Sequence, residues 1–421
     1  MLGVSFACIM RMEDKKMKIK SFAWASFALL LVVSIGHSTP IEAESIEDRI
    51  DLSGIGLTGL DLNRSHLNQS DLTGADLSRS DLSASFLRYA WLKDADLRLA
   101  ILSDSDLTSA DLSGANLVGT DLSGSILRRA LFSGAHLEDA ILRGADLTEA
   151  SLTDADLARA DLTEARLFRT DLSGADMRGV YLIRANLLGA HVSWADLSGA
   201  NMAESQLSRA ELYQTNLSGS DLSRSDLSRS YMMRAILRDA DLSWANLAYA
   251  DLTEADLEEA SLVSARLTHA DFTGSNLHGA DLSNANMDKV NLIGINLSHA
   301  TLNGVRLSGL DMRGTDLHGV QLKGALLDAL YLTKANMSGA NLRGASLTMV
   351  EMTEVDLRGA NLERIDCDVF TLHSLLNAKL DGSIISEDLM EELILLGWEG
   401  PGIYNESASE SPLQPWPYEG I

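Results

Sequence analysis

Proline is missing from most of this 421-residue chain. Its five prolines all lie outside residues 51–365, at Pro40, Pro401, Pro412, Pro415 and Pro417. A residue without a backbone N–H has no place in a continuous β-ladder, so this exclusion favours a wall of hydrogen-bonded strands. Proline makes up about 5% of an average chain, so chance does not account for the gap.

Positively charged residues and cysteines are also scarce. The first shortage limits the kinds of partner that the protein can bind, and the second limits the disulfides that it can form. Asp and Glu number 60 against 34 Lys and Arg, which gives a formal net charge of -26. Such a charge opposes direct binding to nucleic acid or anionic lipid and leaves a basic protein partner open. The two cysteines are Cys8 and Cys367, and Cys8 lies in a segment expected to be removed, so no internal disulfide is predicted.

Long apolar runs are limited to one near the N-terminus. From Met17, which is the better candidate for the translation start, two lysines precede an apolar run over residues 22–35 and a polar stretch ending at Ala43. This layout predicts a secretory signal peptide within residues 1–43, cleaved after Ala43. The run is shorter than the roughly 20 residues of a membrane-spanning helix. An exported product, periplasmic or secreted, is therefore expected, and an uncleaved membrane anchor is the alternative.

Convergent clusters of catalytic residue types are not found in the sequence either. The nine histidines are scattered, and His278 and His318 are expected to lie two coils, about 9.6 Å, apart, too far for one metal ion. No glycine loop suited to a phosphate group is found. The sequence therefore predicts no catalytic residue, no metal site and no cofactor, in a protein that is not an enzyme.

What the chain does have is leucine at every fifth position. From Leu52 to Leu362, leucine (or Met, Phe or Val) occupies the centre of 63 consecutive units without insertion or deletion. Alanine most often stands two residues before the centre, and Asp or Asn stands one residue before it in 37 units. Five residues match neither a helical turn nor strand alternation. A chain that bends once per unit places leucine and alanine inside and Asp or Asn outside, which is a solenoid.

The exceptions to leucine indicate the size of one coil. Val192, Met232, Phe272, Met312 and Met352 recur every 40 residues, which suits a twenty-residue coil of four units. The A-[DN]-L-x-x unit resembles the signature of the pentapeptide-repeat protein family. The resemblance implies an all-β solenoid over residues 44–365. It would be a right-handed quadrilateral β-helix of about sixteen coils of four pentapeptides, forming a rod on the order of 75 Å long.

Beyond the repeats, residues 366–398 predict a small helical cap over the last coil. One apolar stripe runs from Phe370 to Lys379, and a second helix begins after Ser386 and stops at Gly397. The alternative for this cap is a homodimer contact, which several relatives in the family make at that end. Residues 399–421 are rich in Pro, Ser and Glu and predict a disordered tail.

One rank of outward positions is a candidate acidic face. With four units per coil, this rank holds Asp or Asn in 13 of 16 places and is interrupted by Gly56, His136 and Ile236. Its aspartates are Asp76, Asp96, Asp156, Asp176, Asp196, Asp256, Asp316 and Asp356. The face suits a basic partner or loosely held cations. The alternative is that Asp and Asn merely suit the bend.

A candidate apolar contact patch lies nearer the N-terminus. Six residues occupy outward positions where Asp or Asn is usual: Phe86, Trp91, Ile101, Ile126, Leu131 and Ile141. Exposed apolar residues on adjacent coils predict a surface for protein contact. Chance relaxation of the motif is the alternative.

These features predict a non-enzymatic, exported structural or protein-binding rod whose partner is unknown. The family resemblance implies an alternative, a DNA mimic that binds a type II topoisomerase (DNA gyrase). Residues 51–360 carry 42 acidic and 26 basic residues, which suits that role. The length of the rod, the lack of loop insertions and the export signal oppose it.

Overall fold

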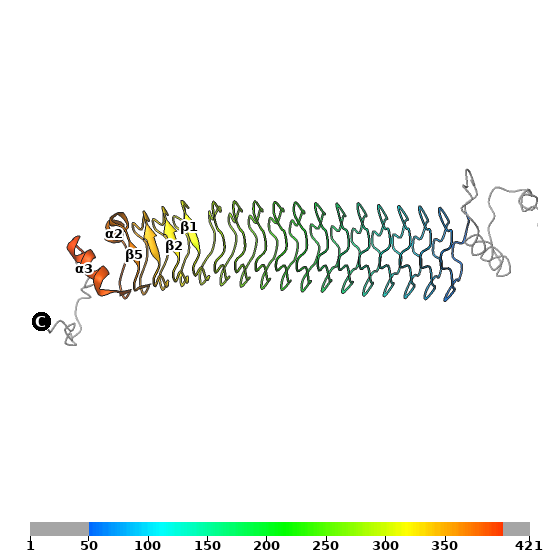
Figure 1. Cartoon of the computed structure of the whole chain (residues 1–421), viewed down its shortest axis with the longest axis horizontal. Coiled ribbons are helices and arrows are strands. Elements are labelled where there is room, and N and C mark those ends of the chain that lie inside the picture. Colours follow the sequence, from blue (N-terminus) through cyan, green and yellow to red (C-terminus); the bar gives the residue numbers. More distant parts are fainter. Residues whose placement is uncertain (1–49, 399–421) are drawn as a thin grey trace, which may run out of the picture.

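The structure, a computed structural model, describes residues 50–398 of the chain. The expected signal peptide and the expected tail fall on residues 1–49 and 399–421, outside the described residues. Figure 1 shows a long rod of stacked coils with helices at its C-terminal end. No helix within residues 50–398 is long and apolar enough to cross a bilayer.

Each coil of the rod takes twenty residues. Asp51 pairs in parallel with Asp71 and Asp76 with Asp96, and this step of twenty recurs along the repeats. One coil therefore contains four five-residue units. The residue before each centre joins one of four ladders that run along the rod. This is the solenoid that the five-residue period predicts.

A single unit illustrates how the chain bends. Leu72 is fully buried, and its carbonyl oxygen accepts a hydrogen bond from the N–H of Ala75 at 3.0 Å, which closes a tight turn. Gly74 in this turn has a left-handed φ of 63°, and Arg79 holds the same place in the next unit at 58°. The N–H groups of Leu72, Gly74 and Asp76 donate to carbonyl oxygens of neighbouring coils. Each unit is thus fixed to the coils on both sides.

The interior of the rod is a column of leucine and small residues. Leucine centres such as Leu102 and Leu222 are fully buried, and burying one leucine side chain contributes about 2 kcal/mol. Serine at the alanine position is satisfied locally, since the hydroxyl of Ser70 donates to the carbonyl oxygen of Leu67 at 2.7 Å. The repeated leucine is therefore the main source of stability, and it dictates the fold.

Strands of two or three residues occur only toward the C-terminal end of the described chain. One parallel sheet contains, in order, β1 (Arg306–Ser308), β2 (Leu326–Asp328), β3 (Ser346–Thr348) and β5 (Asp366–Cys367). A second parallel pair joins β4 (Asn361–Leu362) to β6 (Ile384–Ile385). In the preceding coils each ladder consists of single bridged residues.

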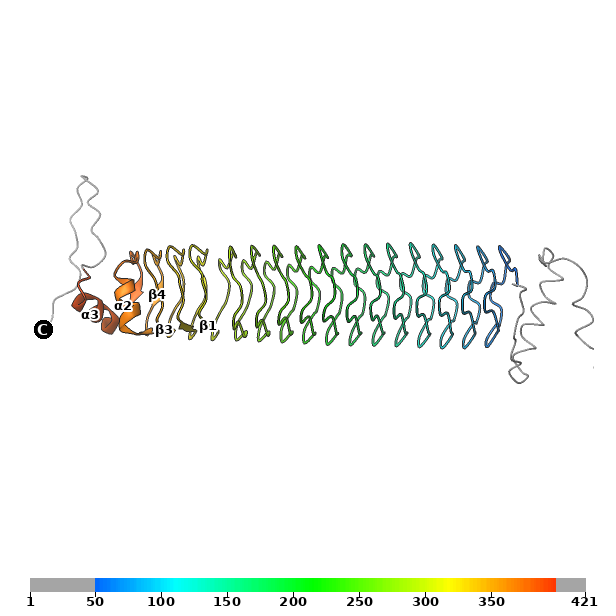
Figure 2. The ribbon, with the colours of Figure 1, turned by 90° about the horizontal axis from the view of Figure 1, so that it is seen from above.

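Two helices, α2 (Val369–Leu375) and α3 (Glu387–Leu395), follow the last coil (Figures 1 and 2). α3 begins after Ser386, as the sequence predicts. α2 ends four residues before the expected Lys379. The reason is that the chain returns to a ladder there, where Lys379 pairs with Asp356.

α2 supplies hydrogen-bond partners to the coil beneath it. The carboxylate of Asp368 accepts from the N–H of Thr371 at 2.9 Å and from the N–H of Met349 at 3.0 Å. The hydroxyl oxygen of Thr371 accepts from the N–H of Val350 at 3.1 Å. Backbone groups that another coil would satisfy are thus satisfied by side chains of the helix.

Candidate functional site

The residues of the candidate acidic face lie in one ladder. Parallel pairing in steps of twenty runs from Asp76 through His136 and Ile236 to Asp356. All eight predicted aspartates belong to it: Asp76, Asp96, Asp156, Asp176, Asp196, Asp256, Asp316 and Asp356. The structure therefore brings these side chains to one side of the rod.

Aspartates of this ladder also serve the turn that follows them. Oδ1 of Asp196 accepts a hydrogen bond from the N–H of Ser198 at 3.0 Å, and Oδ1 of Asp156 accepts from Ala158 at 3.0 Å. Asn216 does the same with the N–H two residues later, at 3.1 Å. This local bond explains why Asp and Asn dominate the position before the centre. Their suitability for the bend is therefore one physical cause of the acidity.

Arginines in the same units as their aspartates compensate three of the eight carboxylates. Each stands two residues after the aspartate with which it pairs, at nitrogen–oxygen distances of 2.5–2.6 Å. The pairs are Arg98–Asp96, Arg178–Asp176 and Arg358–Asp356. Hydrogen bonds from these arginines hold the pKa of the three aspartates below its usual value, against an opposing effect of burial.

Asparagines of the ladder donate neutral hydrogen bonds to three carboxylates, of which Asp256 also pairs with Arg238. Asn216 donates to Asp196, Asn276 to Asp256 and Asn336 to Asp316, at 2.9–3.1 Å. Asp76 is hydrogen-bonded by the hydroxyl of Ser78 at 2.7 Å. Within the eight described aspartates, Asp156 alone has no side-chain donor in hydrogen-bond contact. Arginines thus pair with four of the eight aspartates, Asp96, Asp176, Asp256 and Asp356, and the charge of the face is compensated unevenly along the rod.

A second arrangement of arginine links neighbouring coils. Where an apolar residue takes the outward position and arginine follows two residues later, the arginine pairs with the aspartate of the next coil. The pairs are Arg88–Asp106, Arg128–Asp146, Arg143–Asp161 and Arg238–Asp256, at 2.5–2.7 Å. Sequence reasoning missed these contacts, although an apolar-Leu-Arg run with Asp eighteen residues after the Arg predicts them.

In the Arg128–Asp146 pair, the aspartate is largely buried and its pKa is shifted by its surroundings. The side chain of Asp146 is only 11% exposed. Burial alone would raise the pKa of Asp146, but hydrogen bonds from Thr148 and Arg128 outweigh it and hold the pKa below its usual value. Asp146 therefore stays ionised and ties its coil to the coil of Arg128.

The structure does not gather the candidate apolar contact patch into one surface. Its six residues fall in three different ladders, as the pairs Phe86 and Ile126, Trp91 and Leu131, and Ile101 and Ile141. An aspartate separates the two members of each pair: Asp106, Asp111 or Asp121. Each side chain is half-exposed, but residues five positions apart belong to different sides of the coil. Sequence proximity therefore overstated their proximity in space.

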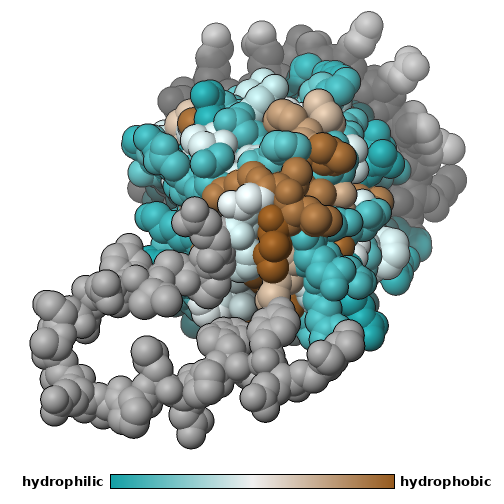
Figure 3. Space-filling view, turned by 90° about the vertical axis from the view of Figure 1, so that its left-hand side faces the viewer, coloured by the Kyte–Doolittle hydropathy of each residue, from teal (hydrophilic) through white to brown (hydrophobic). Residues whose placement is uncertain are grey.

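Exposed apolar side chains do gather at the C-terminal end of the rod, where Figure 3 shows an apolar band. Phe370 of α2 is exposed, as are Ile394 and Leu395 of α3, and Leu395 reaches 85% exposure. α3 turns Leu389 and Leu393 inward instead. The outer side of the cap therefore presents apolar residues that the cap itself does not need for packing.

A family profile identifies the repeats. The profile described as "Pentapeptide repeats (8 copies)" matches residues 50–88, 90–129, 130–167, 160–199, 190–229, 235–274, 250–288, 291–328 and 325–364. These matches cover more than half of the chain. A comparison with curated protein sequences gives no match.

The chain is similar to three solved structures of pentapeptide repeat proteins. HetL of the cyanobacterium Nostoc sp., involved in heterocyst differentiation regulation, is 33% identical over 57% of this chain and 90% of its own, with a TM-score of 0.26. Rfr23 of the cyanobacterium Cyanothece is 39% identical over 20% of this chain and 58% of its own, with a TM-score of 0.20. QnrB1, a plasmid-mediated fluoroquinolone resistance protein, is 17% identical over 56% of this chain and 94% of its own, with a TM-score of 0.19.

Proposed function

Because the chain belongs to the pentapeptide repeat family, we propose that it is a non-enzymatic rod that is exported and binds a protein partner through its surface. In this proposal the rod is a right-handed quadrilateral β-helix of about sixteen coils. The observation that carries it is the acidic ladder from Asp76 to Asp356, a row of carboxylates in fixed register along one side.

A basic partner is the best chemical match for that ladder. Neighbouring positions of the ladder lie about 4.8 Å apart, so its eight carboxylates fall at multiples of that spacing along one side of the rod, with asparagine at most of the places between them. An extended segment rich in Lys or Arg meets such a face with complementary charge, which favours fast association and sets orientation. The candidate contact residues remain the eight aspartates. Binding of this kind weakens as salt concentration rises.

Export rests on the N-terminal sequence. The basic start after Met17, the short apolar run and the small residue at Ala43 together suit a secretory signal peptide. Under this proposal the mature protein begins near Glu44 and acts in the periplasm or outside the cell. Cell fractionation followed by intact-mass analysis tests it. A full-length protein recovered from the cytoplasm would overturn the proposed location.

The apolar outer side of the cap is proposed as the contact with a second copy of this chain. Exposed Phe370, Ile394 and Leu395 offer the apolar anchors that dimer interfaces use, and the rod end is the place where the family resemblance implies a dimer. Light scattering of the wild type and of Leu395→Asp tests the contact. A dimer that Leu395→Asp converts to a monomer supports it, and a monomeric wild type at high concentration contradicts it.

The alternative function is a DNA mimic that binds a type II topoisomerase (DNA gyrase). The net charge of -26 and the rod shape favour it. The ion pairs that compensate Asp96, Asp176 and Asp356 oppose it, because a duplex carries an uncompensated charge at every phosphate. A supercoiling assay separates the two proposals. Inhibition by the purified rod at low micromolar concentration would favour the mimic, whereas an unaffected gyrase together with export would favour the exported rod.

A further inference from the structure

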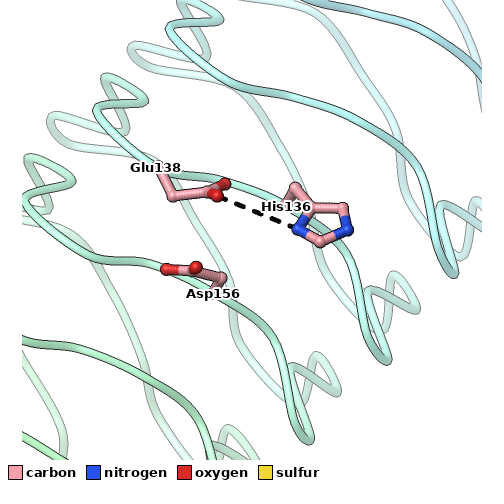
Figure 4. A group of neighbouring side chains, drawn as sticks. All are labelled: His136, Glu138 and Asp156. Atoms are coloured by element: carbon pink, nitrogen blue, oxygen red, sulfur yellow. Dashed lines mark ion pairs between the residues drawn. The ribbon is translucent and has the colours of Figure 1, made fainter.

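One place in the acidic ladder is held by histidine, with two carboxylates beside it. His136 lies between Asn116 and Asp156 in the ladder, and Glu138 stands two residues after His136 in the same unit. Figure 4 shows His136 and Glu138 on one coil and Asp156 on the next. One nitrogen or oxygen atom of each side chain lies within 4.8 Å of the others. Nδ1 of His136 and Oε1 of Glu138 are 3.9 Å apart, too far for a hydrogen bond.

Glu138 contributes an observation that is independent of this clustering. Its Oε2 atom is buried and has no hydrogen-bond partner, and it is the one such side-chain atom among residues 50–398. Leaving a buried carboxylate oxygen unsatisfied is destabilising, so native structures almost always give it a partner. The side chain as a whole is 26% exposed, which leaves a route for a small ligand from solvent.

Another unit of the same ladder shows what a protein partner for this glutamate looks like. Glu258 holds the position that corresponds to Glu138, six coils further on. Arg238 of the preceding coil pairs with Glu258 at 3.2 Å and with Asp256 at 2.5 Å. The residue that corresponds to Arg238 in the coil before Glu138 is Val118, which has no donor on its side chain. The carboxylates near His136 thus lack the cation that their counterparts have.

Nearby arginines do not make up the difference. Arg159 attracts both Glu138 and Asp156 at longer range, but its guanidinium pairs with Asp139 at 2.7 Å. Arg178 also acts on Asp156 at a distance while it pairs with Asp176 at 2.6 Å. Oδ1 of Asp156 accepts only the N–H of Ala158. An imidazole nitrogen and two carboxylates therefore face a common space without a bound positive charge.

We propose that His136, Glu138 and Asp156 bind one divalent transition-metal cation, for which Zn²⁺ is the best match. Imidazole nitrogen with carboxylate oxygen is a donor set that Zn²⁺ accepts, at about 2.0–2.2 Å from the metal. Ligand atoms around one such ion are roughly 3–4 Å apart, so small side-chain rotations complete the site. The cation neutralises the two carboxylates, satisfies Oε2 of Glu138 and joins two successive coils. Its remaining coordination positions are open to water or to a partner's side chain.

Isothermal titration of the purified full chain with Zn²⁺ tests this site. Three variants remove one ligand each and introduce a residue that the same position carries elsewhere on the rod, so the fold is expected to persist. They are His136→Asn, Glu138→Ser and Asp156→Asn. We expect one Zn²⁺ per chain in the wild type and at least about a tenfold weaker affinity in each variant.

Two control variants separate this site from other sources of zinc binding. Asp171→Asn removes the same charge from a neighbouring ladder, so it reports general attraction of cations to an acidic rod. His299→Asn interrupts a row of three histidines whose rings pack edge to face, with centroids 5.4 Å and 5.0 Å apart along His278, His299 and His318. Neither control is expected to change the affinity by more than about twofold.

Two results would overturn the proposal. One is the absence of Zn²⁺ binding to the folded wild-type chain up to millimolar concentration. The other is an affinity for Zn²⁺ that is the same in His136→Asn as in the wild type, because the imidazole of His136 would then not be a ligand. This holds even if His299→Asn abolishes Zn²⁺ binding. Circular dichroism of each variant confirms that a loss of binding is not a loss of fold.

Discussion

The middle of the rod and the coils after residue 285 use the same five-residue unit but are joined differently. In the middle, the N–H of Ala165 closes its turn to the carbonyl oxygen of Leu162 at 3.0 Å. Later, Val290 and Val305 stand in the alanine position, and the same bond lengthens to 3.4 Å in both. At Leu310 that bond is lost, and the segment before it straightens into β1. The long and open turns thus coincide with bulky inward residues at these positions, but Val180 and Val320 close their turns at 3.1 Å, so side-chain volume alone does not decide the shape of the turn.

The two kinds of turn meet at one step of the rod. Within the described residues, Asn291 and Asp311 are the one pair of neighbours in their ladder that forms no bridge, and the N–H groups of Leu292 and Asp311 lack their inter-coil hydrogen bonds. When a tight turn is stacked on an open one, these N–H groups do not point at the carbonyl oxygens of the neighbouring coil. Beyond this step β1, β2 and β3 pair in register, because open turns stack on open turns. Figures 1 and 2 show a wider spacing on the N-terminal side of β1.

Proline substitutions should separate the two regions most strongly. In Asp221→Pro the missing N–H removes a hydrogen bond to Ala200 of 2.9 Å, and we expect a loss of about 3 kcal/mol or more in the free energy of unfolding. In Asp311→Pro no such bond exists to be lost, so we expect a cost of roughly 1 kcal/mol. Each of the two aspartates also accepts a hydrogen bond that caps a turn. Both variants lose such a bond, so its loss cancels when their free energies of unfolding are compared. Urea unfolding measures the difference, and equal losses would remove the distinction between the regions.

Cavity-forming substitutions should rank the regions in the same order. Leu222 is fully buried between regular coils, and Leu222→Ala should cost about 3–5 kcal/mol. Leu292 lies at the irregular step, where looser coils can close around a missing side chain, so Leu292→Ala should cost about 2 kcal/mol. Thermal and urea unfolding of the two variants provide the measurement. A larger loss for Leu292→Ala would mean that the irregular step is as tightly packed as the middle.

The ion pair between Arg128 and Asp146 joins two regular coils. It should contribute less to the free energy of unfolding than the backbone hydrogen bond or the buried leucine. Arg128→Met should lower stability by about 0.2–1 kcal/mol at pH 7. Because the folded protein lowers the pKa of Asp146, this contribution is present above the pKa of the unfolded chain and is lost as the pH falls through the lower folded value. The stabilities of the wild type and the variant should therefore converge as the pH falls below the lowered pKa of Asp146. Arg313→Met is the control, because Arg313 pairs within its own unit with Asp311 and joins no coils.

The smallest effect concerns the thiol at the end of the rod. Burial, followed by the charges of Glu392, Asp366 and Asp368, raises the pKa of Cys367 to about 12. Cys367 should therefore react with a thiol reagent at pH 8 many times more slowly than it does in urea-unfolded protein. Labelling followed by intact-mass analysis measures the rate. Fast labelling of the folded chain would show that the cap does not close over the last coil.

The sequence was sufficient for the solenoid and for the acidic ladder, because both depend on a fixed period. A step of five residues fixes what points inward, and a step of twenty fixes what lies in one ladder. The proposed apolar patch ignored the second rule: Phe86 and Trp91 are near in sequence but lie on different sides of the coil. The spacing of twenty was the signal that could have corrected it.

The cluster at His136 and the missing hydrogen bonds at Asp311 depend on particular combinations of residues, which the five-residue and twenty-residue periods do not reveal. The cluster at His136 needs an outward histidine, a glutamate in the following turn and an aspartate one coil later, whereas the sequence search compared histidines only with one another. The lost bonds at Asp311 depend on the shapes of two turns in successive coils. Bulky residues at the alanine position, such as Leu310 and Leu330, are visible in the sequence, but the step at which the ladder breaks is not.

Hydrogen exchange measured by mass spectrometry tests most directly whether the coils on either side of the Asn291–Asp311 step are joined less firmly than those in the middle of the rod. Peptides from the middle of the rod, such as residues 221–250, should keep their amide protons for hours under native conditions. Peptides spanning residues 286–314 should exchange faster by about tenfold or more, since some of their inter-coil hydrogen bonds, among them those of the Leu292 and Asp311 N–H groups, are missing. Protection that is uniform from residue 75 to residue 360 would contradict the account.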